Sequence, residues 1–224
     1  ESRYVQTKIV CVSLRRLRIL FNDQFKKYYI LWEHIVTKKN TQTSLDFLQE
    51  RIDLAAAFRW AERLNLHEGV ANHFSLAIND SGSKFLINPN QSHFARIKAS
   101  DLIQIDANDP ETISRPNSPD VTAWGLHGSI HRRCPHARCV MHVHSIYATV
   151  LASLKNSHLP PIDQNCATFF NRYVIDEGYG GLAFEEEGER CAALLHDPKK
   201  QVMIMGNHGI LIIGKNVNET FNRL

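Results

Sequence analysis

Residues 126–145 read LHGSIHRRCPHARCVMHVHS, and the rest of the fold can be worked out from this stretch. Its first half belongs to a predicted helix that runs through WGLHGSIHRR and stops before Pro135. Its second half, RCVMHVHS over 138–145, alternates and is rich in valine, which predicts a strand. Because residues i and i+2 of a strand project from one face, His142 and His144 stand side by side. Their imidazoles are free to converge on one cation.

Helices and strands alternate along the chain on both sides of this stretch. Helices are predicted over about 44–65, 146–154 and 186–195, and NVNETFNRL at the end has the pattern of another. Strands are predicted over 74–78, 84–89, 102–106, 168–176, and in the segments QVMIMGN and HGILIIG. This order predicts one layered α/β or α+β domain over residues 44–224.

Two helix starts carry specific signals. Thr43-x-x-Asp46 has the form of a capping box ahead of the first helix. Ser118 is the predicted N-cap of the helix that leads into 126–145, with Pro119 at its first helical position. Asp120 then falls in the first turn, where a negative charge favours the helix dipole.

Composition excludes several classes of protein. With 224 residues, 43% hydrophobic and 22% charged, the chain has enough apolar material for a sizeable core and is not disordered throughout. No apolar run approaches the roughly 18 residues of a membrane span. Residues 1–43 hold nine Lys/Arg against three Asp/Glu, and residues 44–224 hold seventeen against twenty. The basic excess therefore belongs to an N-terminal appendage over 1–43.

Cysteine usage indicates a reducing compartment. The five cysteines are scattered and lack the paired CxxC spacing of a structural zinc site: Cys11, Cys134, Cys139, Cys166 and Cys191. We therefore expect buried thiols and a cytoplasmic location. The expected partner is a small-molecule substrate, with neither nucleic acid nor a membrane as a partner.

Histidine is abundant, with twelve residues in the chain. Random placement of that many gives roughly 0.6 HxH pairs, so His142-Val143-His144 alone is weak evidence for a metal. His208 adds to it, because it lies between glycines in Met205-Gly206-Asn207-His208-Gly209, at the junction of two predicted strands. Three neutral imidazoles with an open fourth position suit catalytic zinc, Zn²⁺, or another divalent metal.

The chain from Arg51 to Leu224 resembles the class II aldolase/adducin head family over nearly the whole of that length. An HxH pair after a helix and a CP turn, together with a distant NHG, is specific in combination. The matching segments are DLAAAFRWAERLNLHEGVANHFSL, FLINP, SDLIQID, LHGSIHRRCPHARCVMHVHS and MGNHGILIIG.

The resemblance implies a three-layer αβα sandwich around a mostly antiparallel sheet. It also implies zinc ligation by His142, His144 and His208, and a homotetramer with active sites between neighbouring subunits. Further helices that pack between subunits follow the NHG strands in the family, and we expect them beyond Leu224. The family includes sugar-phosphate aldolases, pentulose-phosphate epimerases and the cytoskeletal protein adducin.

One catalytic group of the resemblance is missing. Family aldolases carry a glutamate general acid/base nineteen residues before the first metal histidine, and that position is Ala123 here. Loss of a positioned acid/base costs about 10²–10⁴ in rate. Asp120 and His127 lie at i−3 and i+4 from Ala123 on one helix face, which makes both candidate catalytic residues. His127 alternatively packs or orients a neighbour, and Asp120 alternatively serves the helix start.

The family's phosphate site is eroded as well. Of the residues at the corresponding positions, Asn72, His73 and Thr122 are the candidate substrate-binding residues. Gln91 stands where the backbone would have to approach a phosphate, which argues against a phosphorylated sugar.

Two functions remain open on the sequence. The first is a zinc-dependent, aldolase-like lyase, or a decarboxylase or epimerase relative, that acts on a small hydroxy-carbonyl compound through an enediolate. The second is a non-catalytic, adducin-like binding or scaffold protein associated with the actin cytoskeleton. The histidines cannot separate them, because adducin heads share the HxH and NHG patterns.

Overall fold

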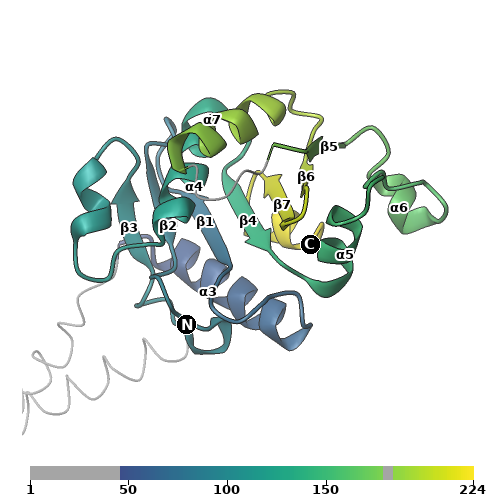
Figure 1. Ribbon diagram of the computed structural model, residues 1–224. Helices are drawn as coiled ribbons and strands as arrows, with labels where there is room; N and C mark the ends of the chain where they lie inside the picture. Colours follow the sequence, from purple (N-terminus) through teal and green to yellow (C-terminus); the bar gives the residue numbers. More distant parts are fainter. Residues whose placement is uncertain (1–45, 179–183) are drawn as a thin grey trace, which may run out of the picture. The chain divides into compact units, whose positions relative to one another are not determined.

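The computed structural model describes residues 46–178 and 184–224 (Figure 1). Phe47–Leu224 form one compact unit. The expected basic appendage over 1–43 and the Thr43 end of the expected capping box lie outside the described residues. The first described helix, α3 (Leu48–Arg63), begins later than predicted, after Phe47 in a left-handed conformation with φ 60.

A seven-stranded sheet forms the middle of the fold. Its spatial order is β3-β2-β1-β4-β7-β6-β5, and every neighbouring pair is antiparallel except β5 with β6. The strands are β1 (His73–Ala77), β2 (Lys84–Ile87), β3 (Ile103–Asp106), β4 (Cys139–Val143), β5 (Tyr173–Asp176), β6 (Val202–Met205) and β7 (Gly209–Gly214). The predicted mostly antiparallel sheet is thus confirmed.

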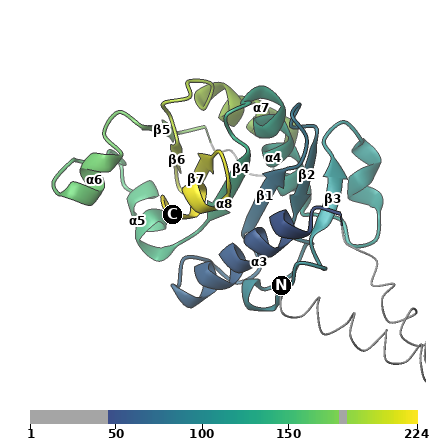
Figure 2. The same ribbon diagram turned by 180° about the vertical axis from the view of Figure 1, so that it is seen from behind.

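Helices cover both faces of this sheet. In both views, α4 (Val121–Arg133) and α7 (Phe184–Leu194) lie along one side of the sheet and α3 along the other (Figures 1 and 2). The short helix α8 (Val217–Phe221) packs on α3, β4 and β7. The remaining elements are α5 (Ile146–Ala152), α6 (Gln164–Thr168) and the 3₁₀ turns η1 (Phe94–Arg96) and η2 (Pro110–Ser114). The predicted three-layer αβα fold is confirmed.

Alternation along the central strands separates two cores. Met141 and Val143 of β4 face α3, where Phe58 stacks on Phe74 with ring centroids 4.7 Å apart. Val140 faces the opposite way, into the core under α4 and α7. His142 shares the face of Val140 because it lies two residues further along the strand. The period of two therefore puts this histidine between the sheet and the α4/α7 layer.

The predicted start of α4 was wrong. Asp120, rather than Ser118, is the N-cap, and its carboxylate accepts hydrogen bonds from the backbone amides of Thr122 (2.9 Å) and Ala123 (3.4 Å). Pro119 consequently lies before the helix and not at its first position. A carboxylate that reaches two free amides of the first turn outcompetes a hydroxyl two residues upstream.

The predicted strand over 168–176 was too long. Thr168 ends α6, whose N-cap Asp163 accepts hydrogen bonds from the amides of Asn165 and Cys166. A turn through Asn171, with φ 58, then separates this helix from β5. The local cap overrides the strand preference of the following aromatic residues. Among the described helices, none is long and apolar enough to cross a membrane.

Candidate functional site

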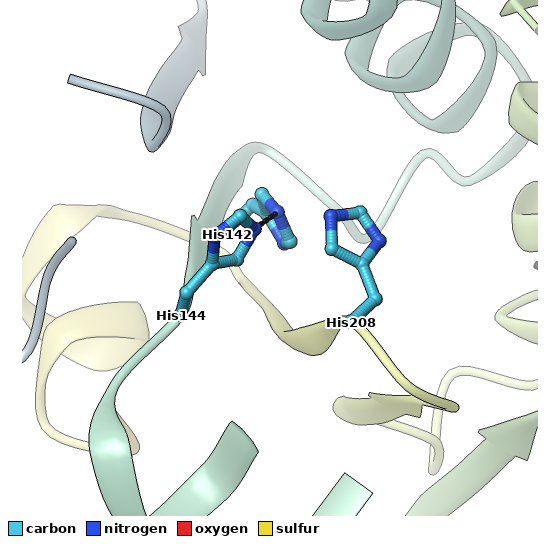
Figure 3. A group of neighbouring side chains, drawn as sticks. All are labelled: His142, His144 and His208. Atoms are coloured by element: carbon cyan, nitrogen blue, oxygen red, sulfur yellow. Dashed lines mark hydrogen bonds between the residues drawn. The ribbon is translucent and has the colours of Figure 1, made fainter. Parts of the chain in front are cut away.

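Three histidines from separate parts of the fold meet at one end of the sheet. His142 lies in the buried run of β4, His144 follows that strand, and His208 lies in the turn between β6 and β7. Their ligand nitrogens lie within 4.8 Å of one another, and Figure 3 shows the three rings turned toward one another. The structure therefore brings the HxH pair and His208 together, as the sequence predicts.

The turn that carries His208 is held by backbone bonds. The amide of Gly206 donates to Asp176 O (2.8 Å) and the amide of Asn207 donates to Ala152 O (2.9 Å). Gly209 starts β7 so close to β4 that a Cβ on it would lie 2.5 Å from Val143 O. Only glycine permits this approach, which brings His208 up to the end of the HxH strand.

Hydrogen bonds fix which nitrogen of each HxH ring is free. The Nδ1 of His142 donates to the carbonyl of Ile210 (3.0 Å), and the Nδ1 of His144 donates to the carboxylate of Glu68 (2.9 Å). In the neutral rings, both Nε2 atoms therefore carry lone pairs. These two atoms lie 2.9 Å apart.

Facing lone pairs repel one another, whereas one cation between them accepts both. Two nitrogens bound to one tetrahedral zinc lie about 3.3 Å apart, close to the separation seen here. Burial and the neighbouring histidines lower the pKa of His142 well below its usual value, which favours the neutral, ligating form. The donor set therefore fits a divalent metal.

Glu68 and Asn72 support the histidine pair from the loop between α3 and β1. The Oδ1 of Asn72 accepts from the amide of Glu68 (2.7 Å) and from that of His144 (3.4 Å). A carboxylate on the second nitrogen of a ligating histidine fixes the ring and strengthens it as a donor. Asn72, expected to bind substrate, thus ties the loop to the HxH strand. The role of Glu68 was missed, because no local pattern links it to a residue 76 positions away.

A second line of histidines runs inward from the site. His73 pairs with His142 across β1 and β4, and their ring centroids lie 4.8 Å apart. The Nδ1 of His73 lies 2.7 Å from the Nε2 of His127, which lies further from the cavity. Ser75 Oγ bonds to the Nδ1 of His127 and, at 2.7 Å, to the Nε2 of His131. This chain of hydrogen bonds ends at the carbonyl of Ala137, which lies 2.8 Å from the Nδ1 of His131.

That carbonyl dictates the proton positions along the chain. A carbonyl only accepts, so the Nδ1 of His131 carries its proton and its Nε2 accepts from the hydroxyl of Ser75. The hydroxyl has one proton to give, so it must accept from the Nδ1 of His127. The Nε2 of His127 then accepts from the Nδ1 of His73. The Nε2 of His73 is left with a lone pair.

Burial keeps these rings neutral. It lowers the pKa of His73 to about 3 and that of His131 to about 4, and it lowers the pKa of His127 well below the usual value. All three side chains are almost fully buried. The tautomers above are therefore those present at neutral pH.

Metal-free protein is expected to lose stability as the pH falls below about 6.5. Below this pH, His127 and His131 bind protons in the unfolded chain but stay neutral in the folded protein. Protonation therefore stabilises the unfolded state. Each of the two histidines lowers the free energy of unfolding by about 1.4 kcal/mol per pH unit, down to its pKa in the folded protein. Urea unfolding in the presence of chelator at pH 7, 6 and 5 measures the slope. The exposed His196→Gln variant should keep it, and a wild-type free energy of unfolding that is constant over this range contradicts the prediction.

A cavity of about 290 Å³ opens onto the three histidines. Seven residues named from the sequence line it besides His142 and His144: Asn72, His73, Gln91, Asp120, Thr122, Ala123 and His208. His127 does not line it and lies behind His73. Glu187 of α7, which was not predicted from the sequence, also lines the cavity. Its segment reads as an ordinary helix, so no local signal marked it.

Asp120 and Thr122 are hydrogen-bonded to each other at the N-terminus of α4. The carboxylate of Asp120 accepts from both the amide and the hydroxyl of Thr122. This bonding matches the helix-start role of Asp120 that the sequence left open. Its catalytic role stays a prediction.

Fold and site together define a three-layer α/β protein of the class II aldolase type with a three-histidine centre. Residues 52–224 match the family described as Class II Aldolase and Adducin N-terminal domain. The chain belongs to this family, as its resemblance predicted.

Individual relatives agree with that assignment. The chain is 28% identical over 166 residues to the 4-hydroxy-3-prenylphenylpyruvate oxygenase/4-hydroxy-3-prenylbenzoate synthase of Streptomyces roseochromogenus subsp. oscitans, covering 73% of this chain and 59% of the relative. It is 33% identical over 168 residues to the Meiotically up-regulated gene 14 protein of Schizosaccharomyces pombe, covering 74% and 64%. An aldolase II superfamily protein from Pseudomonas syringae superposes with a TM-score of 0.72 at 29% identity, covering 82% of this chain and 73% of that one. The chain thus spans about three fifths of the length of these curated relatives.

Proposed function

We propose that this chain is a metal-dependent carbon–carbon lyase that acts on a small, unphosphorylated compound with a hydroxyl beside a carbonyl. The observation that carries the proposal is the approach of the Nε2 atoms of His142 and His144 to 2.9 Å, beside His208 and open to a cavity. Such a centre suits catalysis because three protein ligands leave a further position for substrate.

The proposed ion is zinc or another divalent metal, held by His142, His144 and His208. When bound, it would act as a Lewis acid that draws electron density from the substrate carbonyl. The protein orients the ligands through Glu68 and the carbonyl of Ile210, which hold two of the three rings by their second nitrogen.

His73 is proposed to recognise the hydroxyl of the substrate. Its Nε2 carries a lone pair fixed by the chain through His127, Ser75 and His131, and the residue lines the cavity. A hydroxyl donates to such an acceptor, which orients the reacting carbon without a change of charge. His127 then acts by positioning His73 rather than by touching substrate. Thr122 is proposed to offer its hydroxyl at the cavity wall.

The lining of the cavity argues against a phosphate. Among the described lining residues there is no lysine or arginine, whereas Asp120 and Glu187 are acidic. Gln91 adopts a left-handed backbone with φ 59 at the cavity edge. The Streptomyces relative is named for a phenylpyruvate, a 2-oxo acid, which agrees with the proposed lack of a phosphate but not with a hydroxyl beside the carbonyl.

The test is a cleavage assay on metal-loaded protein. The panel holds unphosphorylated hydroxy-ketones and 2-oxo acids, with fuculose and fuculose 1-phosphate as a matched pair, and products are followed by NMR. We expect cleavage of an unphosphorylated member and its loss on addition of chelator. Turnover that resists the chelator contradicts the metal mechanism, and preference for the phosphate ester contradicts the substrate class. Absence of turnover combined with co-sedimentation with actin favours the adducin-like alternative.

A cytoplasmic homo-oligomer, with a tetramer as the expected form, completes the proposal. Four described cysteines are free thiols, which suits a reducing compartment. Helix α5 carries exposed apolar side chains at Ile146, Tyr147 and Val150, and Tyr147 is 90% exposed. An apolar stripe of this kind suits contact with a second copy of the chain.

A further inference from the structure

Helices α4 and α7 touch through their backbones. A Cβ added to Gly188 of α7 would lie 2.5 Å from the carbonyl oxygen of Gly125 and 2.8 Å from the hydroxyl of Ser129. The absence of a side chain at Gly188 therefore lets the helices approach more closely than a side chain there would allow. Because of this approach, the residue before Gly188 lines the same cavity as residues of α4.

That residue is Glu187. Its side chain lines the cavity together with Ala123 and Leu126 of α4 and with His208, yet it is only 4% exposed. Within the part of the chain that the structure describes, its buried Oε1 has no hydrogen-bond partner. An ionised carboxylate oxygen without a partner is costly to bury, whereas a neutral carboxyl is tolerated.

The surroundings favour the protonated form. Burial raises the pKa of the Glu187 carboxyl, Arg190 lowers it and Asp176 raises it. Arg190 is committed to Asp176, since its Nε and Nη2 each donate to that carboxylate at 2.9 Å. The positive charge nearest to Glu187 is thereby offset. From the side of α4, Asp120 adds a further negative charge to the same cavity.

We propose that Glu187 is the proton donor of this site, filling from α7 the role for which the family resemblance implies a glutamate at position 123. Ala123 lines the cavity with a methyl group and supplies no acid there. Glu187 reaches the same cavity from the neighbouring helix. The inference rests on the proposed lyase function and assigns it a catalytic residue.

The step balances without an oxidant or reductant. The bond that breaks joins the carbon beside the carbonyl to a neighbouring carbon that bears a hydroxyl, and its electron pair stays on the carbon beside the carbonyl. Glu187 gives its carboxyl proton to that carbon and becomes a carboxylate. The departing fragment forms its own carbonyl and releases its hydroxyl proton to water, and water returns a proton to Glu187.

The kinetic test compares two glutamates of one helix. Glu187→Gln keeps the size of the side chain but removes the acid, and we expect kcat to fall by about 10²–10⁴ with KM changed far less. Glu186→Gln, at an exposed position, should keep wild-type kcat. Metal content is measured on both variants. Wild-type turnover in Glu187→Gln overturns the inference, and so does loss of metal, because Glu187 would then support the metal centre instead.

A second measurement needs no turnover. Protein labelled with ¹³C in the glutamate carboxyls is titrated by NMR, and the resonance missing in Glu187→Gln identifies the residue. We expect this carboxyl to ionise at a higher pH than the exposed Glu186. Ionisation at the same pH as Glu186 overturns the inference even if the protein is an active lyase. A raised pKa in a protein without lyase activity would instead count against the proposed function.

Discussion

His142→Ala is expected to lower bound divalent metal from about one per chain to below about 0.2, and to lower turnover by more than about 10³-fold. The variant removes one of the three proposed ligands, so the Nε2 of His144 no longer faces a second ligand nitrogen. Two remaining imidazoles hold a catalytic ion weakly, because each ligand supplies a large part of the affinity. Metal is measured by elemental analysis after mild purification.

The matched control is a histidine away from the site. His158 is exposed and bonds to the hydroxyl of Tyr173, so His158→Ala should keep both metal and turnover. His208→Ala should repeat the loss seen for His142→Ala, since it removes the third ligand from a different strand junction. Full metal content in either ligand variant would show that the ion binds elsewhere.

Gly188→Ala is expected to lower the free energy of unfolding by about 2 kcal/mol. The added methyl would lie 2.5 Å from the carbonyl of Gly125, which forces α4 and α7 apart. Overpacking of this kind costs about 3 kcal/mol, and the gain in helix propensity returns about 1. For a domain of this size the melting temperature should fall by about 4–8 °C. Thermal unfolding followed by circular dichroism measures the change.

A second glycine separates packing from backbone effects. A Cβ on Gly69 would meet nothing within 4 Å, but its φ is +50, so Gly69→Ala carries only the strain of a left-handed alanine, about 1 kcal/mol. Gly188→Ala should therefore be the more destabilised of the two. Equal or higher stability than the wild type would mean that the helices separate freely, and the placement of Glu187 would lose its structural basis.

Local patterns were sufficient to predict that the three histidines of the candidate centre meet. Strand geometry alone brings His142 and His144 to one face, and a glycine-flanked junction accounts for His208. Both are short-range facts, so they can be derived from a few neighbouring residues. The same reasoning failed at α4, where Ser118 and Asp120 compete as caps and only the bonds to Thr122 and Ala123 decide between them.

Residues that act over long sequence separations could not be predicted this way. Glu68 reaches His144 only because a loop lies against the end of β4, and Ser75 reaches His127 only because β1 packs under α4. Glu187 depends on a crossing of two helices that are far apart in the sequence. None of these contacts has a periodicity or spacing that a sequence displays.

The chain from His73 to Ala137 also has an electrical polarity. Each N–H and O–H along it points away from the cavity and toward the carbonyl of Ala137, so the bond dipoles add in one direction. Its negative end is the bare nitrogen of His73 at the cavity wall. These neutral groups thus produce a fixed electrostatic field at the cavity that attracts cations and hydrogen-bond donors and repels anions. Such a field would favour the metal and the neutral hydroxyl of the proposed function over a phosphate.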